Sequence, residues 1–316
     1  MKRPFRAVFH IRDISGTDMV SNDYLVRGTA QEGRVRIFAL DATATVETLR
    51  ARHQTEPAVT AALGRTALGA LLLGAMLKQA SQLVTLRVNG GGPAGVLLAS
   101  ANGAGDVRGL VANPRPAIEQ VREDGKLNVS GAVGSSGHLT VTRELGMRAP
   151  YSSTVEMVSG EIGEDLAWFF ASSEQVPSAV GIGVFVRVDG TVEAAGGYIV
   201  QLVGGLSDEE AEQVERAIRA LPHPTTMLRQ GDTPETMLER IFPTGLDLLG
   251  RTPVRFHCPC TLERAERALV LLDAGELEDV RESDARRGFT ELVCQFCGEQ
   301  YRISPDELER LIGEAG

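Results

Sequence analysis

Four cysteines, the complete set in this chain, form two short motifs toward its end. The first motif is "HCPC" at residues 257–260, the second is "CQFC" at residues 294–297, and 33 residues separate them. Two closely spaced thiol pairs joined by a longer segment are typical of a tetrahedral metal site made of four thiolates. The candidate ligands are therefore Cys258, Cys260, Cys294 and Cys297.

The chemistry of the donor atoms indicates which metal they would hold. Four soft thiolates in a tetrahedron favour zinc, although an iron–sulfur cluster uses the same ligands and stays open at this point. Gly298 follows the second motif and suits the turn that directs two sulfurs at one metal. His257 adjoins the first motif, but with four thiols present we expect it to be a neighbour rather than a ligand. Structural disulfides are the alternative, and they are rare in a reducing cytoplasm.

The segment around the cysteines has few large apolar side chains with which to build a core. Within residues 251–316 they include Phe256, Leu269, Leu271, Leu272, Phe289, Phe296 and Tyr301. A unit this small cannot depend on its core alone. Metal binding worth about 10–16 kcal/mol is then expected to supply most of its folding free energy. Oxidation of two thiolates to a disulfide removes two ligands together, so the metal would leave and the unit would unfold.

The first 205 residues must supply the scaffold, and their pattern predicts an α+β domain of mixed sheet and helix. Residues 23–44 alternate polar and apolar side chains on either side of residues 31–33, as two paired strands would. A long helix is predicted from residue 56 to residue 79, with Thr55 as its N-cap. Apolar residues occupy almost every turn of that helix, which indicates burial at the centre of the domain.

Residues 82–100 contain a literal G-x-G-x-x-G at Gly90, Gly92 and Gly95. A dinucleotide-binding loop of that form requires a helix directly after it, whose N-terminus meets the pyrophosphate. The apolar run "VLLAS" follows instead. The segment is therefore predicted to be a strand, a turn and a second strand.

The rest of this domain is predicted to continue the alternation of strands and helices. Residues 137–145 predict a strand, and residues 177–203 predict a hairpin that turns at Asp189-Gly190. Residues 161–175 predict a helix between them. The side chains of that helix expected to face the core are Leu166, Trp168, Phe169 and Phe170.

Residues 206–250 predict a helical linker. Ser207 and Glu210 form a capping-box pattern at the start of an amphipathic helix, and residues 233–242 predict a second, shorter helix. Helices with a single apolar stripe must lie on a surface, and the N-terminal domain offers the natural one. The chain is thus predicted to comprise an N-terminal domain (1–205), a docked helical linker (206–250) and a small C-terminal zinc-binding domain (251–316).

The charge distribution bears on the choice of partner. The net charge is −10, yet residues 1–205 hold 19 acidic and 19 basic side chains, so the excess negative charge lies in the last third. An acidic surface is repelled by a phosphate backbone, and nucleic acid is therefore not an expected partner. The N-terminal apolar run is interrupted by His10, Arg12 and Asp13, and residues 66–77 are too few to span a bilayer. We expect a cytoplasmic protein with no membrane role.

The cysteine motifs and several longer stretches resemble the heat-shock protein 33 family of redox-regulated holdase chaperones. "CPCTLERAERAL" leads from the first motif into a helix, and "CQFCGEQY" ends the site. The likeness extends over nearly the whole chain, in order and spacing, through "RGTAQEGRVRIFALDAT", "ALGRTALGALLLGAMLK", "GHLTVTREL", "FFASSEQVPSAV" and "AAGGYIVQLV".

The resemblance implies a function and a mechanism. In the family, the reduced form binds zinc and is inactive, and peroxide with unfolding conditions, or hypochlorous acid, forms disulfides within the two cysteine pairs. Zinc release then unfolds the metal domain and the linker, and exposes apolar surface that holds unfolding client proteins. Carried over, the zinc ligands and redox thiols are Cys258, Cys260, Cys294 and Cys297. Whether oxidation produces a homodimer stays open.

Two alternatives belong to other functional classes. A zinc-ribbon regulator that binds nucleic acid has the same thiol pattern, but the negative charge counts against it. A thiol oxidoreductase would use Cys294 and Cys297 in turnover, but this C-x-x-C does not follow a strand and open a helix as in a thioredoxin-like unit. No nucleotide-binding motif is present, which suits an ATP-independent holdase rather than an enzyme.

Overall fold

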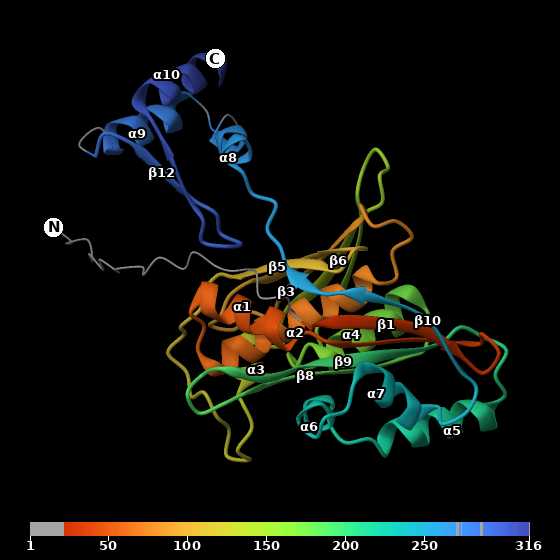
Figure 1. Cartoon of the computed structure of the whole chain (residues 1–316). Helices are drawn as coiled ribbons and strands as arrows, with labels where there is room; N and C mark the ends of the chain where they lie inside the picture. Colours follow the sequence, from red (N-terminus) through yellow and green to blue (C-terminus); the bar gives the residue numbers. More distant parts are fainter. Residues whose placement is uncertain (1–21, 270–271, 273, 285–286, 316) are drawn as a thin grey trace.

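A computed structural model describes residues 22–269, 272, 274–284 and 287–315. The interrupted apolar run with His10, Arg12 and Asp13, and Leu271 of the predicted C-terminal apolar set, lie outside these residues. The described chain forms a larger part with two sheets, here called the two-sheet unit (residues 22–256), and a smaller C-terminal unit (residues 257–315). Figure 1 shows the C-terminal unit in blue, standing off from the two sheets.

The first sheet is entirely antiparallel and has five strands. In spatial order they are β10 (Leu246–Pro253), β1 (Tyr24–Ala30), β2 (Val35–Asp41), β9 (Val192–Leu202) and β8 (Ser178–Val186). The predicted pair of strands in residues 23–44 and the predicted hairpin in residues 177–203 are confirmed. β10 begins in the last residues of the predicted linker and continues into the predicted C-terminal domain, and it joins a sheet made by the N-terminal residues.

The second sheet has six strands and connects the two-sheet unit to the cysteines. In spatial order they are β11 (Arg255–Phe256), β5 (Asp106–Val111), β4 (Leu97–Asn102), β3 (Leu83–Asn89), β6 (His138–Glu144) and β7 (Tyr151–Glu156). Only the short β11 pairs in parallel, with β5. Cys258 therefore lies two residues beyond a strand that is anchored to the sheet.

The long apolar helix α2 (Pro57–Gly74) is buried between the sheets, as predicted (Figure 1). A Cβ at Gly64 would lie 2.7 Å from side-chain carbons of both Val46 and Val184, so only glycine permits this approach. The predicted ends were wrong. Glu56, not Thr55, is the N-cap, because Pro57 occupies the first helical position, and the helix ends at Gly74 rather than residue 79.

Three other helical segments of the two-sheet unit precede the linker in the sequence. They are α1 (Thr43–His53), α3 (Val129–Val133) and α4 (Gly163–Phe169), the last continuing into a π-helical turn η1 (Phe170–Glu174). Leu166, Phe169 and Phe170 are buried as predicted, but Trp168 is 46% exposed, so its assignment to the core was wrong. Successive residues of a helix point about 100° apart, and Trp168 falls on the outer face.

The G-x-G-x-x-G segment is the turn between β3 and β4, as predicted, and no helix follows it. Its glycines serve packing. A Cβ at Gly90 would lie 2.1 Å from the carbonyl oxygen of Gly134, and one at Gly92 would lie 2.4 Å from the backbone of Val133. The glycines are therefore required by the close approach of two backbone segments.

The linker residues form three short helices against the first sheet. They are α5 (Asp208–Arg219), α6 (Pro224–Arg229) and α7 (Pro234–Ile241). The side chain of Ser207 accepts a hydrogen bond from the backbone N–H of Glu210, which confirms the predicted capping box. A second apolar core joins these helices to the sheet, with Val214, Met227, Met237, Leu238 and Ile241 packed against Val26, Ile37, Ala39 and Val200.

A polar contact fixes the last linker helix beside this core. The hydroxyl of Tyr24 in β1 donates to Oε2 of Glu235 in α7 at 2.7 Å, and Arg251 in β10 lies 2.6 Å from Oε1 of the same carboxylate. The guanidinium of Arg251 also lies over the Tyr24 ring, 4.9 Å from its centroid. One carboxylate thus ties the linker to the first strand and to the strand that leads to the cysteines.

The C-terminal unit has a small core of its own. Its elements are α8 (Leu262–Leu269), α9 (Ala274–Asp284), β12 (Thr290–Val293), β13 (Gln300–Ile303) and α10 (Pro305–Ala315). The buried apolar residues there are Leu269, Leu277, Ile303, Leu308 and Leu311. Of the apolar set expected from sequence, only Leu269 belongs to this buried group. Phe256 and Phe296 contact arginines of the two-sheet unit, and Tyr301 contacts a cysteine. Five buried aliphatic side chains among the described residues of this unit are few for its size.

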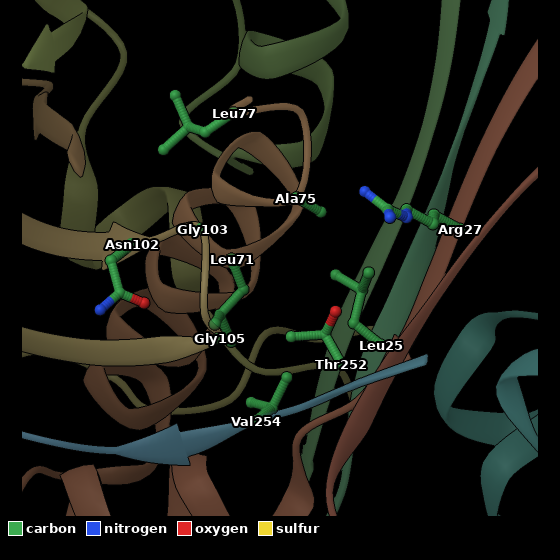
Figure 2. Close-up of a pocket in the computed structure, with 10 residues that line it drawn as sticks. All are labelled: Leu25, Arg27, Leu71, Ala75, Leu77, Asn102, Gly103, Gly105, Thr252 and Val254. Carbon is green, nitrogen blue, oxygen red and sulfur yellow. The ribbon is translucent and has the colours of Figure 1, made fainter. Parts of the chain in front are cut away.

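A pocket lies where the chain leaves the two-sheet unit. Figure 2 shows Thr252 and Val254 on one side of it and Leu25 and Arg27 of β1 on another, with the end of α2 above. Val254 is only 1% exposed. The segment that leads to the cysteines therefore covers apolar side chains of α2 and β1.

One described helix, α2, is long and apolar enough to cross a membrane, but 89% of that stretch is buried inside the structure. Burial between two sheets is the environment of a core helix.

Candidate metal and redox centre

The structure brings the four cysteines together from two chain segments. Cys258 and Cys260 lie between β11 and α8, and Cys294 and Cys297 lie in the turn between β12 and β13. Their four sulfur atoms all lie within 4.8 Å of one another, and all four thiols are free. Within the described residues, this is the only group of three or more His, Cys, Asp or Glu side chains placed to hold a metal ion.

The turn around Cys294 and Cys297, here called the knuckle (residues 294–299), is closed by backbone hydrogen bonds. The N–H of Cys294 donates to the carbonyl of Glu299 at 2.9 Å, and the N–H of Gly298 donates back to the carbonyl of Cys294 at 2.8 Å. Gly298 has φ +75°, a conformation that favours glycine. The residue after the second motif is thus a glycine because the turn that aims both sulfurs inward requires it.

The sulfur separations fit a tetrahedral metal. Sγ of Cys258 lies 3.8 Å from Sγ of Cys294, and Sγ of Cys260 lies 3.3 Å from Sγ of Cys297. These exceed the S–S bond length of about 2.05 Å. A tetrahedron with metal–sulfur bonds of about 2.3 Å has edges of about 3.8 Å. Four sulfurs at such distances, with no carboxylate or imidazole among them, form a donor set that fits a soft, tetrahedral cation.

The pKa values of three of the thiols, Cys258, Cys294 and Cys297, are shifted in different directions. Burial raises the pKa of Cys258 and raises that of Cys297 further. Burial also acts on Cys294, but hydrogen bonds from the backbone of Phe296 and from Cys297 outweigh it and hold the pKa of Cys294 below its ordinary value. Of these three thiols, Cys294 is thus the most readily ionised without a metal. A bound cation deprotonates the others outright.

Side chains next to the sulfurs complete the site. The hydroxyl of Tyr301 donates to Sγ of Cys260 at 3.1 Å, and Nη1 of Arg108 in β5 lies 4.0 Å from Sγ of Cys258. His257 is exposed and its backbone N–H donates to the carbonyl of Val107, and its side chain is not part of the cluster of four candidate ligands. The sequence predicts Tyr301 only as one of the few large apolar residues, although its position four residues after Cys297 is a signal for this contact.

Replacement of Tyr301 by phenylalanine is expected to lower metal affinity while leaving the fold intact. The variant loses one hydrogen bond to a sulfur ligand but keeps the ring, and losing such an outer partner costs about 10- to 100-fold in affinity. Competition with a chromophoric chelator measures the change. Tyr151→Phe, an exposed tyrosine on β7, is the matched control. Equal affinities of the two variants would show that the Tyr301 hydroxyl does not support the sulfur.

Comparison with known proteins agrees with this geometry. A sequence model of the family described as Hsp33 protein matches residues 23–304. The 33 kDa chaperonin of Bacillus subtilis (strain 168) is 44% identical over 289 residues, covering 92% of this chain and 98% of the relative. The 33 kDa chaperonin of Geobacter sulfurreducens is 43% identical over 298 residues, covering 94% and 97%.

A solved structure is similar over nearly the same extent. The crystal structure of the 33 kDa chaperonin from Thermotoga maritima, described as a heat shock protein 33 homolog, superposes with a TM-score of 0.84. It is 38% identical in sequence, and the match covers 93% of this chain and 99% of that one. Sequence and fold agree, and the family consists of non-enzymatic holdases, which excludes the thiol-oxidoreductase alternative. The chain belongs to the Hsp33 family of chaperones.

Proposed function

We propose that this chain is an ATP-independent holdase controlled by the oxidation of Cys258, Cys260, Cys294 and Cys297. The observation that carries the proposal is the convergence of four sulfurs within 4.8 Å in a unit with only five buried apolar side chains in its described core. Metal binding worth about 10–16 kcal/mol is then the main source of that unit's stability. Loss of the metal therefore unfolds the unit.

Zinc is the metal of this proposal, held by all four thiolates in the reduced, inactive form. In each oxidation, two thiolates lose two electrons and form a disulfide. One hydrogen peroxide molecule accepts those electrons with two protons and becomes two water molecules. Two such steps use all four sulfurs and release Zn²⁺ to the solvent. An iron–sulfur cluster, with the same ligands, would be distinguished by its visible absorption and by metal analysis.

The resemblance to the family supports disulfides within the pairs, Cys258 with Cys260 and Cys294 with Cys297. The shortest sulfur separations run between the pairs, at 3.3 and 3.8 Å, yet all four sulfurs are close enough for either pairing after small movements. Peptide mapping of the oxidised protein distinguishes the two. Disulfides within the pairs leave the two motifs unlinked, and disulfides between the pairs join them.

Unfolding of the C-terminal unit is proposed to spread into the linker. The three functional segments are an N-terminal chaperone domain (1–205), a linker (206–250) and a redox-switch domain (251–316). Strands β10 and β11 join the linker and the redox-switch domain to the sheets. Helices α5 to α7 cover apolar side chains of the first sheet. Release of these helices uncovers the apolar side chains of the first sheet, and release of the segment around Val254 uncovers the pocket beneath it. Both surfaces would then bind the apolar segments of unfolding client proteins. A cytoplasmic location fits thiols that must remain reduced.

The test is a client-aggregation assay with the full chain in defined redox states. Protein oxidised with peroxide at raised temperature is expected to suppress aggregation of a thermally unfolding client, and reduction with dithiothreitol plus zinc is expected to abolish that protection. Light scattering measures the effect without ATP. If oxidised and reduced protein protect the client equally, the redox control proposed here is wrong.

A further inference from the structure

Three basic side chains of the two-sheet unit hold the tip of the C-terminal unit, at the place where hairpin β12–β13 turns back toward β5 (Figure 1). They are Arg52 and His53, at the end of α1, and Arg108 in β5. None of them could be associated with the cysteines from sequence, because they lie 150 or more residues away along the chain.

Two of these side chains bind backbone carbonyls of the knuckle. Nη1 of Arg52 donates to the carbonyl of Cys297 at 2.9 Å. Nε2 of His53 lies 3.1 Å from the carbonyl of Phe296 and 2.8 Å from that of Gly109 in β5. Since both neighbours are acceptors, Nε2 carries the hydrogen and is shared between them. These carbonyls face the two-sheet unit only while the knuckle keeps its turn.

The third side chain reaches the sulfur cluster itself. The guanidinium of Arg108 stacks on the ring of Phe296, 4.1 Å from its centroid, while its Nη1 lies 4.0 Å from Sγ of Cys258. Arg52 makes a similar contact with the ring of Phe256, at 4.8 Å. Both cysteine pairs thus have an arginine of the two-sheet unit beside them.

The charge of the cluster changes with its redox state. Four thiolates and one Zn²⁺ carry a net charge of −2, whereas two disulfides without the metal carry none. An arginine next to the loaded cluster is attracted by that negative charge, and the attraction ends when the cluster is oxidised. The acidic excess of the C-terminal unit does not explain the contact, because the guanidinium groups approach the sulfurs and the knuckle carbonyls rather than carboxylates.

We propose that Arg52, His53 and Arg108 form a docking site for the zinc-loaded knuckle and hold the C-terminal unit against the sheets only in the reduced state. This inference rests on the proposed function, since it requires zinc at the four thiolates. The three are positioning residues that oppose metal release by stabilising the folded, anionic knuckle. Oxidation removes the charge and the turn together, so docking is lost in the step that releases zinc.

The test uses the full-length, reduced, zinc-loaded protein without oxidant. Arg108→Gln is expected to accelerate zinc transfer to a chromophoric chelator about 10-fold or more, as for losses of outer partners of a metal site, while zinc stoichiometry stays at one per chain. Salt screens the electrostatic contact of Arg108, so the rate of zinc transfer from the wild type is expected to rise with salt concentration. The variant lacks this contact, and its rate should depend less on salt. Arg108→Lys, which keeps the charge, should fall between them.

Arg87→Gln is the matched control, an exposed arginine on β3 of the same sheet. Hydrogen exchange of residues 246–256 provides a second readout, and is expected to be faster in Arg108→Gln than in Arg87→Gln. If both variants release zinc at the wild-type rate with the same salt dependence, the docking site is refuted while oxidative zinc release can still hold. If the wild type binds no zinc, the proposed function itself fails.

Discussion

Replacement of Cys294 and Cys297 together by serine is expected to abolish stoichiometric zinc binding and to unfold the C-terminal unit in fully reduced protein. The double variant removes two of four ligands, as one disulfide would. Most of the metal-binding free energy of about 10–16 kcal/mol is lost with them, and the five buried apolar side chains found among the described residues of this core cannot replace it. Metal analysis and hydrogen exchange of β12 and β13 measure the two effects.

The same variant is expected to protect a client from aggregation without any oxidant. Its C-terminal unit is unfolded, so the linker is no longer held against the first sheet. His257→Ala is the matched control, since His257 adjoins the cluster but its side chain is exposed and is not one of the four clustered ligands. The control should bind one zinc per chain and stay inactive when reduced. A double serine variant that stayed folded and inactive would show that the metal is not what holds the inactive form.

Replacement of Leu238 by alanine is expected to release the linker from the first sheet at temperatures where the wild type stays inactive. Leu238 in α7 is completely buried in the core that joins the linker helices to β1 and β2. Truncation of a buried leucine costs about 2–5 kcal/mol, a large share of what a few short helices gain by packing. Hydrogen exchange of residues 206–241 and client protection by reduced, zinc-loaded protein report the release.

Glu239→Ala is the control for Leu238→Ala, because the next residue of the same helix is exposed. It changes helix composition and charge but removes no buried contact, so the linker should exchange as in the wild type. Zinc content should stay at one per chain in both variants, which separates linker release from metal loss. If Leu238→Ala and Glu239→Ala behave alike, packing of the linker does not control exposure of the sheet.

The features that could be predicted from sequence were those decided by local pattern. Paired strands joined by short turns, the buried apolar helix α2 and the capped helix α5 all carry their own signals, and the structure contains them. Helix α1 was missed because its apolar residues form no continuous stripe, and it buries only Thr45, Val46 and Leu49. Helix α6 was missed because six residues between prolines and a glycine are too short for a periodic pattern.

The cysteine site shows the same division between local and distant determinants. The spacing of the four thiols and Gly298 indicated a common cluster, because each pair and its turn are encoded within four or five residues. The contacts of Arg108 and Arg52 depend on how β5 and α1 meet the knuckle in three dimensions, for which one sequence carries no signal. Leu277 and Leu311 of the C-terminal core were likewise not singled out, since isolated leucines in charged helices do not show which side is covered.

The central claim is that zinc is released as the four thiols are oxidised. Zinc and free thiols should be counted in the same sample before and during treatment with peroxide at raised temperature. We expect one zinc per chain to be released in step with the loss of all four thiols, and both to return after reduction with added zinc. Loss of the thiols with zinc still bound, or release of zinc with all four thiols still reduced, would contradict this claim.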